Sequence, residues 1–355
     1  MRFSTDSDIV NEAIRVALRL SPPITGNFTF EVSDHQLYLH SVDSLSRCSI
    51  LIPAPVDADE DTSFAIPATA LKDAISGRKD LTFDFDGSLL TIKSGRYRVK
   101  LTTLDSIGIE REEVRGKPWH VTVEQLAWLK NAVASVYLKP TQNITSFMPV
   151  SVQLTDRSAF IACADGNHMM FTRTKEVTGN MEFTLPIDTL TAVLDTFNKV
   201  ECKMLLTGSA LHVKNQLVDV SLALPAVKEE SVIGIDLLRE KAQEAIKADG
   251  QSVQIKKKEV MDFLSNSRSV SDKSRSELQI KVEPDFVTFT VKTTIGTARA
   301  KIQADTQLDA EFRIDSEYFE EAVRKSGDQI ILKYADSFIS MRTTDAYSLI
   351  ALNQE

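Results

Sequence analysis

The segment Phe64–Leu104, FAIPATALKDAISGRKDLTFDFDGSLLTIKSGRYRVKLTTL, contains the plan of a small αβ unit. Its residue pattern predicts a strand, a short helix that begins after Pro67, and then two or three strands with alternating apolar positions. The same plan recurs at Phe183–Leu224 and at Phe312–Leu352. The three starting phenylalanines are 119 and 129 residues apart, so the repeat has the length of a domain.

A second version of this plan precedes each copy. At the N-terminus, a short strand leads to a helix for which Asp6 or Ser7 is the expected N-cap and Pro22 the stop signal. Three alternating strands follow from Gly26. We therefore predict an α+β fold with six half-units of strand, helix and strands. They form three tandem domains, 1–117, 118–227 and 251–355.

The remaining segment, 228–250, is predicted to be a linker with a short helix. Asp236 is a candidate cap for this helix, and Leu238, Ala242 and Ala245 make a thin apolar stripe along it. This insertion accounts for the longer of the two repeat spacings.

Composition limits the classes of protein to consider. The chain has 355 residues with 43% hydrophobic and 26% charged side chains, values that suit several folded domains. Its N-terminus lacks a secretory pattern, and no apolar run is long enough to span a membrane. Cys48, Cys163 and Cys202 have no metal-site or redox spacing. We expect a cytoplasmic, reduced protein that does not bind membranes.

The net charge of −9 argues against nucleic-acid binding only if the charges are evenly spread. Acidic clusters occur in predicted links and turns, at 57–61, 110–113, 229–230 and 305–311. Basic residues occur on the predicted helices and at their ends. These cations are Arg15, Arg19, Lys72, Arg78, Lys79, Lys130, Lys139, Lys199, Lys258, Arg268, Lys273, Arg324 and Lys325. Acidic residues such as Glu12 and Glu320 share the helices, so ordinary solvated helix faces remain an alternative.

The sequence gives no support for catalysis. It contains no phosphate-binding glycine loop, no HExxH zinc motif and no GxSxG nucleophile motif. The five histidines share no ligand spacing. We therefore predict a protein that is not an enzyme and needs no cofactor or metal.

The threefold plan resembles the beta sliding clamp of bacterial replicative DNA polymerases along essentially the full chain. Phe64–Leu104 looks like the end of the first domain of that family. ITGNFTFEV at 24–32 is similar to its ILGNLLLQV segment, and ADGNHMM at 164–170 to TDGHRLA. The ending YSLIALNQE is similar to its apolar C-terminal tail. The divergence between these segments indicates a phage-encoded or otherwise remote member.

The resemblance implies a ring in which two three-domain subunits close head to tail. Helices would line the hole and sheets would form the outside, so that helix cations attract phosphates of double-stranded DNA without reading bases. The implied DNA-facing residues are the thirteen cations named above together with Gln142, which matches the family's loop after the second-domain helix. Val99, Leu101 and Val270 would lie at the subunit interface, although Val99 and Leu101 also suit a plain buried strand.

In that family an apolar pocket binds short peptides of the polymerase and the clamp loader. The corresponding residues here are Ala164, Gly166, Asn167, His168, Met169, Leu349, Ile350 and Leu352. His168 replaces the family's arginine and Asn167 its histidine. In the linker, Val232 and Ile233 are weaker candidates. Ile350 and Leu352 are equally compatible with a strand buried in the core.

These expectations favour a DNA sliding clamp, a processivity factor that tethers the replicative polymerase. Two alternatives remain open at this point. One is a clamp-fold ring that recruits transcription or repair factors in place of a polymerase. The other is a β-rich structural assembly protein whose repeats only build a shell.

Overall fold

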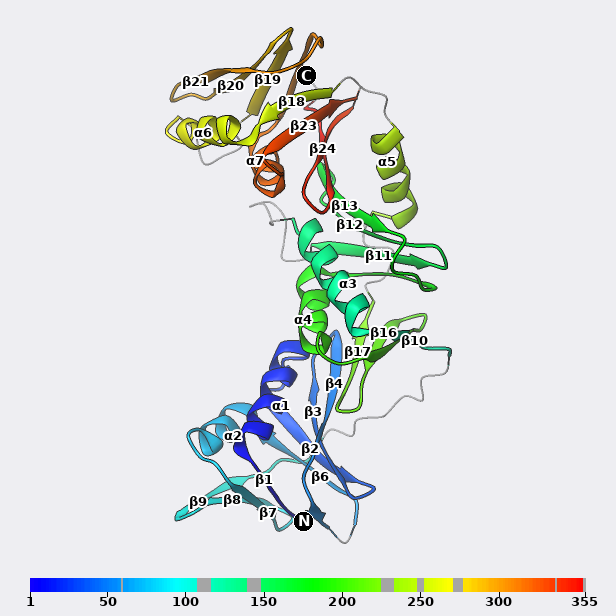
Figure 1. Cartoon of the computed structure of the whole chain (residues 1–355). Helices are drawn as coiled ribbons and strands as arrows, with labels where there is room; N and C mark the ends of the chain where they lie inside the picture. The colour runs from blue at the N-terminus through cyan, green and yellow to red at the C-terminus, as the bar shows by residue number, and fades with distance from the viewer. Residues whose placement is uncertain are drawn as a thin grey trace. The chain divides into compact units, whose positions relative to one another are not determined.

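The three repeated segments fold as predicted in a computed structural model, which describes residues 1–58, 60–106, 116–138, 148–224, 233–247, 252–270, 277–335 and 337–353. Each copy is a strand, a helix and three strands (Figure 1). The first copy is β6 (Thr62–Pro67), α2 (Ala68–Ile75), β7 (Leu81–Phe85), β8 (Leu89–Ser94) and β9 (Tyr97–Thr102). The second is β14 (Met181–Pro186), α4 (Ile187–Phe197), β15 (Cys202–Leu206), β16 (Ala210–Lys214) and β17 (Val218–Ala223). The third is β22 (Ala310–Asp315), α7 (Ser316–Lys325), β23 (Gln329–Tyr334), β24 (Phe338–Arg342) and β25 (Tyr347–Ala351).

The predicted half-units that precede these copies are also present. The first contains β1 (Arg2–Thr5), α1 (Ser7–Leu20), β2 (Asn27–Ser33), β3 (Gln36–Val42), β4 (Ser46–Ile52) and the short β5 (Val56–Asp57). The second contains β10 (Trp119–Val121), α3 (Val123–Val136), β11 (Pro149–Thr155), β12 (Ser158–Ala164) and β13 (His168–Thr174). The third contains β18 (Ser252–Lys256), α6 (Lys257–Ser267), β19 (Glu277–Glu283), β20 (Phe286–Lys292) and β21 (Thr297–Gln303).

Capping and amphipathic spacing explain α1. The Asp6 carboxylate accepts a hydrogen bond of 2.8 Å from the backbone N–H of Asp8, which confirms Asp6 as the N-cap. Val10, Ile14 and Ala17 are buried at the helical spacing. The opposite face of α1, with its charged side chains, is therefore left toward solvent.

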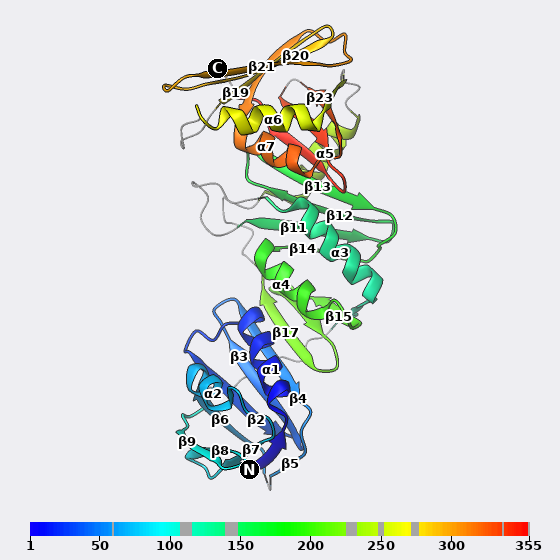
Figure 2. The same ribbon diagram turned by 60° about the vertical axis from the view of Figure 1, so that its left-hand side comes forward.

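The strands form two compact units, which by contacts comprise Met1–Ala127 with Asp188–Pro225, and Trp128–Ile187 with Ala226–Glu355. The first unit has a five-stranded sheet in the order β5-β1-β7-β8-β9 and an eight-stranded sheet in the order β10-β15-β16-β17-β4-β3-β2-β6. The second has an eight-stranded sheet in the order β14-β11-β12-β13-β25-β24-β23-β18 and a four-stranded sheet in the order β21-β20-β19-β22. In this second unit, α6 and α7 lie beside the four-stranded sheet (Figure 2).

Both eight-stranded sheets cross the domain boundaries predicted from the sequence. In the first, β17 pairs with β4, so that Val220 lies opposite Cys48. In the second, β13 pairs with β25, so that His168 lies opposite Ile350. Antiparallel edge pairing thus joins half-units that are far apart in the sequence. The division into three domains stays a prediction.

The linker helix α5 (Ile235–Lys247) packs on the second unit's eight-stranded sheet. Its predicted stripe is confirmed, because Leu238, Ala242 and Ala245 are all buried. Ile235 extends the stripe by one turn, and Asp236 lies in the first turn of the helix. No helix among the described residues combines the length and the apolar character needed to cross a membrane.

Candidate nucleic-acid interface and peptide pocket

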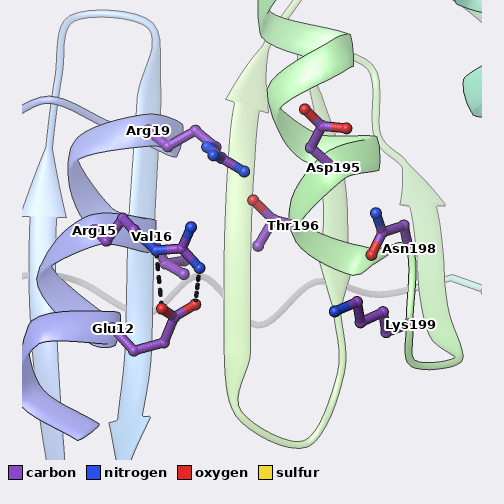
Figure 3. Close-up of a pocket in the computed structure, with 8 residues that line it drawn as sticks. All are labelled: Glu12, Arg15, Val16, Arg19, Asp195, Thr196, Asn198 and Lys199. Atoms are coloured by element: carbon purple, nitrogen blue, oxygen red, sulfur yellow. Dashed lines mark hydrogen bonds and ion pairs between the residues drawn. The ribbon is translucent and has the colours of Figure 1, made fainter. Parts of the chain in front are cut away.

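A small cavity of about 150 Å³ lies between α1 and the end of α4 in the first unit (Figure 3). We call it the basic cavity. It is lined by Glu12, Arg15, Val16, Arg19, Asp195, Thr196, Asn198 and Lys199. Arg19 and Lys199 extend from opposite sides toward the space between the two helices (Figure 3). The structure therefore brings together three of the cations that the sequence placed on helices or at their ends.

Three cations and two carboxylates, Glu12 and Asp195, line the basic cavity. Arg15 donates two hydrogen bonds to the Glu12 carboxylate, from Nε at 2.9 Å and from Nη2 at 2.6 Å. These bonds, together with the charges of Arg15, Arg19 and Lys199, lower the pKa of Glu12. The Arg15–Glu12 pair is neutral as a unit, so Arg19 and Lys199 are the cations most open to an external anion.

Other cations on the helices of the first unit differ in how freely they can reach a phosphate. Lys72 on α2 and Lys79 after it are exposed. Arg78 is held in place, because its guanidinium lies 3.5 Å from the centre of the Tyr97 ring and donates to the Ser76 carbonyl at 2.6 Å. Arg78 therefore serves to attach the end of α2 to β9.

In the second unit, Lys258 on α6 is exposed, whereas Lys130 on α3 is half-buried. Arg268 donates to Oε1 of Glu320 and so joins the end of α6 to α7, and Arg324 of α7 donates to the same oxygen. One shared carboxylate offsets part of their charge. Three further residues that the sequence assigned to DNA, Lys139, Gln142 and Lys273, lie outside the described residues.

Lys325 differs most from its prediction as a DNA-facing residue. Its Nζ donates to the Tyr137 carbonyl, lies 3.4 Å from the Met170 sulfur and lies 3.4 Å from Oε1 of Glu321. Burial lowers the pKa of this ammonium, although Glu321 partly opposes the shift. Lys325 thus connects α7 to the end of α3 inside the unit and does not present its charge on an open helix face.

A tight turn between β12 and β13 positions the second candidate site. Oδ1 of Asp165 accepts hydrogen bonds from the backbone N–H groups of Asn167 at 3.1 Å and His168 at 2.8 Å. Gly166 has a φ of +94°, which a side chain would strain. The turn also contacts the last strand, since the Ala351 N–H donates to the Asn167 carbonyl at 2.8 Å.

An apolar pocket of about 270 Å³ opens beside this turn. Three elements build its walls: the β12–β13 turn, α5 with the residues before it, and β24 with β25. Its lining residues are Ala164, Gly166, Asn167, His168, Met169, Ile233, Leu237, Leu238, Lys241, Ser337, Phe338, Leu349 and Ala351. Six of the eight residues that the sequence assigned to a peptide pocket therefore line one cavity.

His168 is a neutral part of this pocket's wall. Its side chain is buried, its Nε2 lies 2.7 Å from the Ser348 hydroxyl, and its ring centre lies 5.0 Å from that of Tyr318. Burial, with a smaller contribution from the charge of Lys325, lowers the pKa of His168 to about 3. At neutral pH the imidazole is uncharged, so His168 adds no positive charge to the pocket wall.

The structure places Ile350 and Leu352 outside the apolar pocket. Ile350 is 1% exposed and lies in a core cluster with residues of β18–β24, against which the half-buried Leu352 also packs. The reason is the period of a strand, since successive side chains point to opposite faces. Leu349 and Ala351 face the pocket, and Ile350 and Leu352 face the core, as the sequence alternative allowed.

Sequence reasoning missed most of the wall that α5 contributes. Leu237 is half-exposed at the pocket, Leu238 is buried, and Lys241 lies at the lining with its ammonium 2.8 Å from Glu244. Arg239 on α5 donates to the Gln153 side chain on β11 at 3.1 Å. The amphipathic stripe of α5 was the signal that this helix packs on a sheet, but the stripe does not say which sheet. Ile233 lines the pocket, and Val232 lies outside the described residues.

Two of the residues predicted at a subunit interface lie on an edge strand, and the third lies beside the turn that precedes another edge strand. Val99 and Leu101 are half-buried on β9, the last strand of the five-stranded sheet. Val270 follows α6, and its carbonyl accepts a hydrogen bond of 2.5 Å from the Thr293 hydroxyl in the turn before β21.

Candidate metal ligands and free thiols were the remaining groups of interest in the described part of the chain. No group of three His, Cys, Asp or Glu side chains among them could hold a metal ion. Cys48, Cys163 and Cys202 are free and buried. Burial raises the pKa of each thiol to about 12, so the thiols stay protonated and unreactive at neutral pH.

Comparison of the whole structure with solved proteins gives full-length matches. The DNA polymerase III subunit beta from Pseudomonas aeruginosa matches with a TM-score of 0.80 and 14% identity, over 100% of both chains. The DNA polymerase sliding clamp from Caulobacter crescentus gives 0.81 and 14% over 100% of both chains. The chain has the sliding-clamp fold. The beta subunit from Thermotoga maritima agrees, with a TM-score of 0.78, 14% identity and coverage of 100% of this chain and 99% of the other. No family model and no curated protein matches the sequence.

Proposed function

We propose that this protein is a DNA sliding clamp, a ring that encircles duplex DNA and tethers a DNA polymerase without catalysing a reaction. The observation that carries the proposal is the sliding-clamp fold over the full length of the chain. A fold alone does not define a function. The proposal therefore also depends on what the candidate sites can bind.

The basic cavity supports contact with DNA phosphates. Arg19 and Lys199 extend into it, and Asn198 adds a side-chain amide. Such groups bind phosphate oxygens through charge and hydrogen bonds but carry no sequence information. Contact of this kind suits a protein that holds DNA and still moves along it. The exposed Lys72, Lys79 and Lys258 would add to the same attraction.

Ring closure is supported by two sheet edges that have no partner strand among the described residues. β9 ends the five-stranded sheet and β21 ends the four-stranded sheet. Pairing β9 of one copy with β21 of a second copy is a heterologous contact, which gives a closed ring when the rotation between copies allows it. Val270, near the start of β21, would then approach the second copy beside its Val99 and Leu101.

The apolar pocket supports the recruitment of partners. Met169, Leu237 and Phe338 give it adaptable apolar walls, and the backbone turn at Gly166 gives it a fixed rim. A polymerase or clamp loader would insert apolar side chains of a short peptide here. The ring then raises the local concentration of the polymerase at the DNA even when this contact is weak.

Chemical closure of the ring around DNA tests the proposal. We would replace Thr102 on β9 and Thr297 on β21 with cysteine, mix the protein with nicked circular plasmid, and close the seam with a flexible bis-maleimide. The native thiols are buried with a raised pKa, so the introduced cysteines should react selectively. We expect protein that stays on the circle in denaturant and is released when the plasmid is cut.

Each single-cysteine variant is the matched control, because it cannot form the cross-link. Cross-linked rings that leave circular and linear DNA equally would contradict encirclement and favour a shell-forming assembly protein. If encirclement holds, a primer-extension assay distinguishes a polymerase clamp from a ring that serves transcription or repair. Only the polymerase clamp lengthens the products.

A further inference from the structure

The free edge strand β9 carries cations on one face and apolar side chains on the other. Arg98 and Lys100 are exposed, whereas Val99 and Leu101 are half-buried. Val99 lies opposite Ile92 and Leu101 opposite Leu90 on β8, two residues of the buried core. Arg98 and Lys100 therefore lie on the face of the sheet that points away from the core.

The free edge strand β21 repeats this arrangement. Arg299 and Lys301 are exposed, and Ala298, Ala300 and Ile302 alternate with them. Ala300 lies opposite Phe289 on β20, which is buried in the core, whereas Arg299 lies opposite Thr290. Both candidate edges of a ring thus present two cations on their outer face. We call these four residues, Arg98, Lys100, Arg299 and Lys301, the seam cations.

The seam cations have few acidic neighbours among the residues that the structure describes. None of them forms an ion pair with another described residue. The charges of Lys301 and Arg299 reach Glu283, but the ammonium of Lys281 holds that carboxylate at 2.8 Å. The Lys301 ammonium itself lies 4.0 Å from the centre of the Phe286 ring. Lys100 acts on Asp86 only at longer range. The described residues therefore leave most of the positive charge on both edges uncompensated.

Strand pairing would bring these charges together. When two edges join into one sheet, apolar side chains of both strands must share the core face, because a slip of one residue would turn the cations inward. The seam cations of the two copies then share the outer face, a few ångströms apart. In an antiparallel pairing of β9 with β21 that aligns their centres, Arg98 lies opposite Lys301 and Lys100 opposite Arg299. Like charges in opposite positions destabilise a sheet.

We infer that closure of this ring is opposed by its own seam and is promoted by salt. The inference rests on the proposed ring of two copies joined through β9 and β21. Salt weakens attractive contacts between surface charges. It screens repulsion between like charges in the same way, so salt favours an association that such repulsion opposes. The Debye length falls from about 10 Å at about 0.1 M salt to about 3 Å at about 1 M. At low salt, the Lys and Arg side chains on the two edges repel one another and keep the copies apart. Charged side chains on edge strands prevent edge-to-edge pairing in the same way.

The test is the dimer dissociation constant as a function of salt, measured by sedimentation equilibrium on the full chain. We expect this constant to fall by about tenfold between about 0.1 M and about 1 M NaCl. Replacing Arg299 and Lys301 with glutamate should place carboxylates opposite Arg98 and Lys100. We expect this variant to dimerise more tightly than the parent at low salt and to weaken as salt rises.

The matched control carries Arg173→Glu and Lys203→Glu, which change the net charge equally at exposed strand positions away from both edges. We expect it to keep the parent's salt response. A parent dimer that weakens or stays unchanged with salt would overturn the inference and leave the ring intact. A parent and a seam variant that both stay monomeric at every salt concentration would overturn the ring itself.

Discussion

Leu349 and Ile350 are neighbours on β25, yet their side chains belong to different sites. Leu349 lines the apolar pocket, whereas Ile350 is buried in the core formed by the β18–β24 region. The sequence had placed both residues in one candidate peptide pocket, but one lines the pocket and the other packs in the core. Substitution of a pocket residue is therefore expected to affect peptide binding, and substitution of a core residue to affect stability.

Ile350→Ala should reduce stability. The side chain is 1% exposed, so its truncation leaves a cavity that the core can fill only in part. We expect a loss of about 3 kcal/mol in the free energy of unfolding, measured by urea denaturation. Leu352→Ala is the control at a half-buried position and should cost less. An Ile350→Ala protein as stable as the parent, but with weaker peptide binding, would place Ile350 in the pocket.

Leu237→Asp should weaken peptide binding without changing stability much. Leu237 is 50% exposed on α5 and lines the apolar pocket, so the new carboxylate would face incoming apolar side chains. A labelled hexapeptide with neighbouring leucine and phenylalanine can report affinity by fluorescence anisotropy. We expect at least about a tenfold loss, with an unchanged melting temperature. Leu217→Asp, at another exposed leucine, is the matched control, and equal losses in both variants would contradict this site.

Much of this architecture follows from local sequence signals. The three repeated segments, the Asp6 cap and the apolar stripe of α5 each depend on residues close together in the chain, so pattern alone predicts them. The turn at 164–169 and the strand ending at Ala351 were also assigned to one pocket, through resemblance to a known family. The structure brings six of those eight residues together.

Other features depend on contacts that no local pattern encodes. The pairings of β4 with β17 and of β13 with β25 join edges far apart in sequence. The strand period predicted two faces for β25 but not which face meets the core, so the sequence left Ile350 compatible with either the pocket or the core. Lys325 has the sequence signature of a helix-end cation, and its contacts with the Tyr137 carbonyl and the Met170 sulfur show that it is enclosed.

Replacing Arg19 and Lys199 with glutamate should weaken DNA binding and lower its salt dependence. Both cations extend into the basic cavity, and each phosphate contact that is lost reduces the number of released counterions (Figure 3). We expect the slope of log K against log salt to fall by about 2, measured by anisotropy with a short duplex. Lys203→Glu with Arg173→Glu changes the net charge equally and should keep more of the slope. Equal effects of the two variants would assign the loss to net charge alone.

Acid should destabilise the protein through His168. Burial is the main cause that lowers the pKa of His168 from 6.5 to about 3, and the charge of Lys325 adds to it. Between pH 6.5 and about pH 3, His168 therefore binds a proton in the unfolded chain but not in the folded one. The stabilisation by the neutral imidazole is complete above pH 6.5 and is lost as the pH falls toward 3. The contribution of this one group is about 1.4 kcal/mol per pH unit within the window.

We expect His168→Gln, which keeps a polar group near the Ser348 hydroxyl, to unfold with a shallower pH dependence. His35→Gln, at an exposed turn position, is the control. Parallel pH profiles for the parent and the His168 variant would show that the imidazole accepts a proton in the folded state.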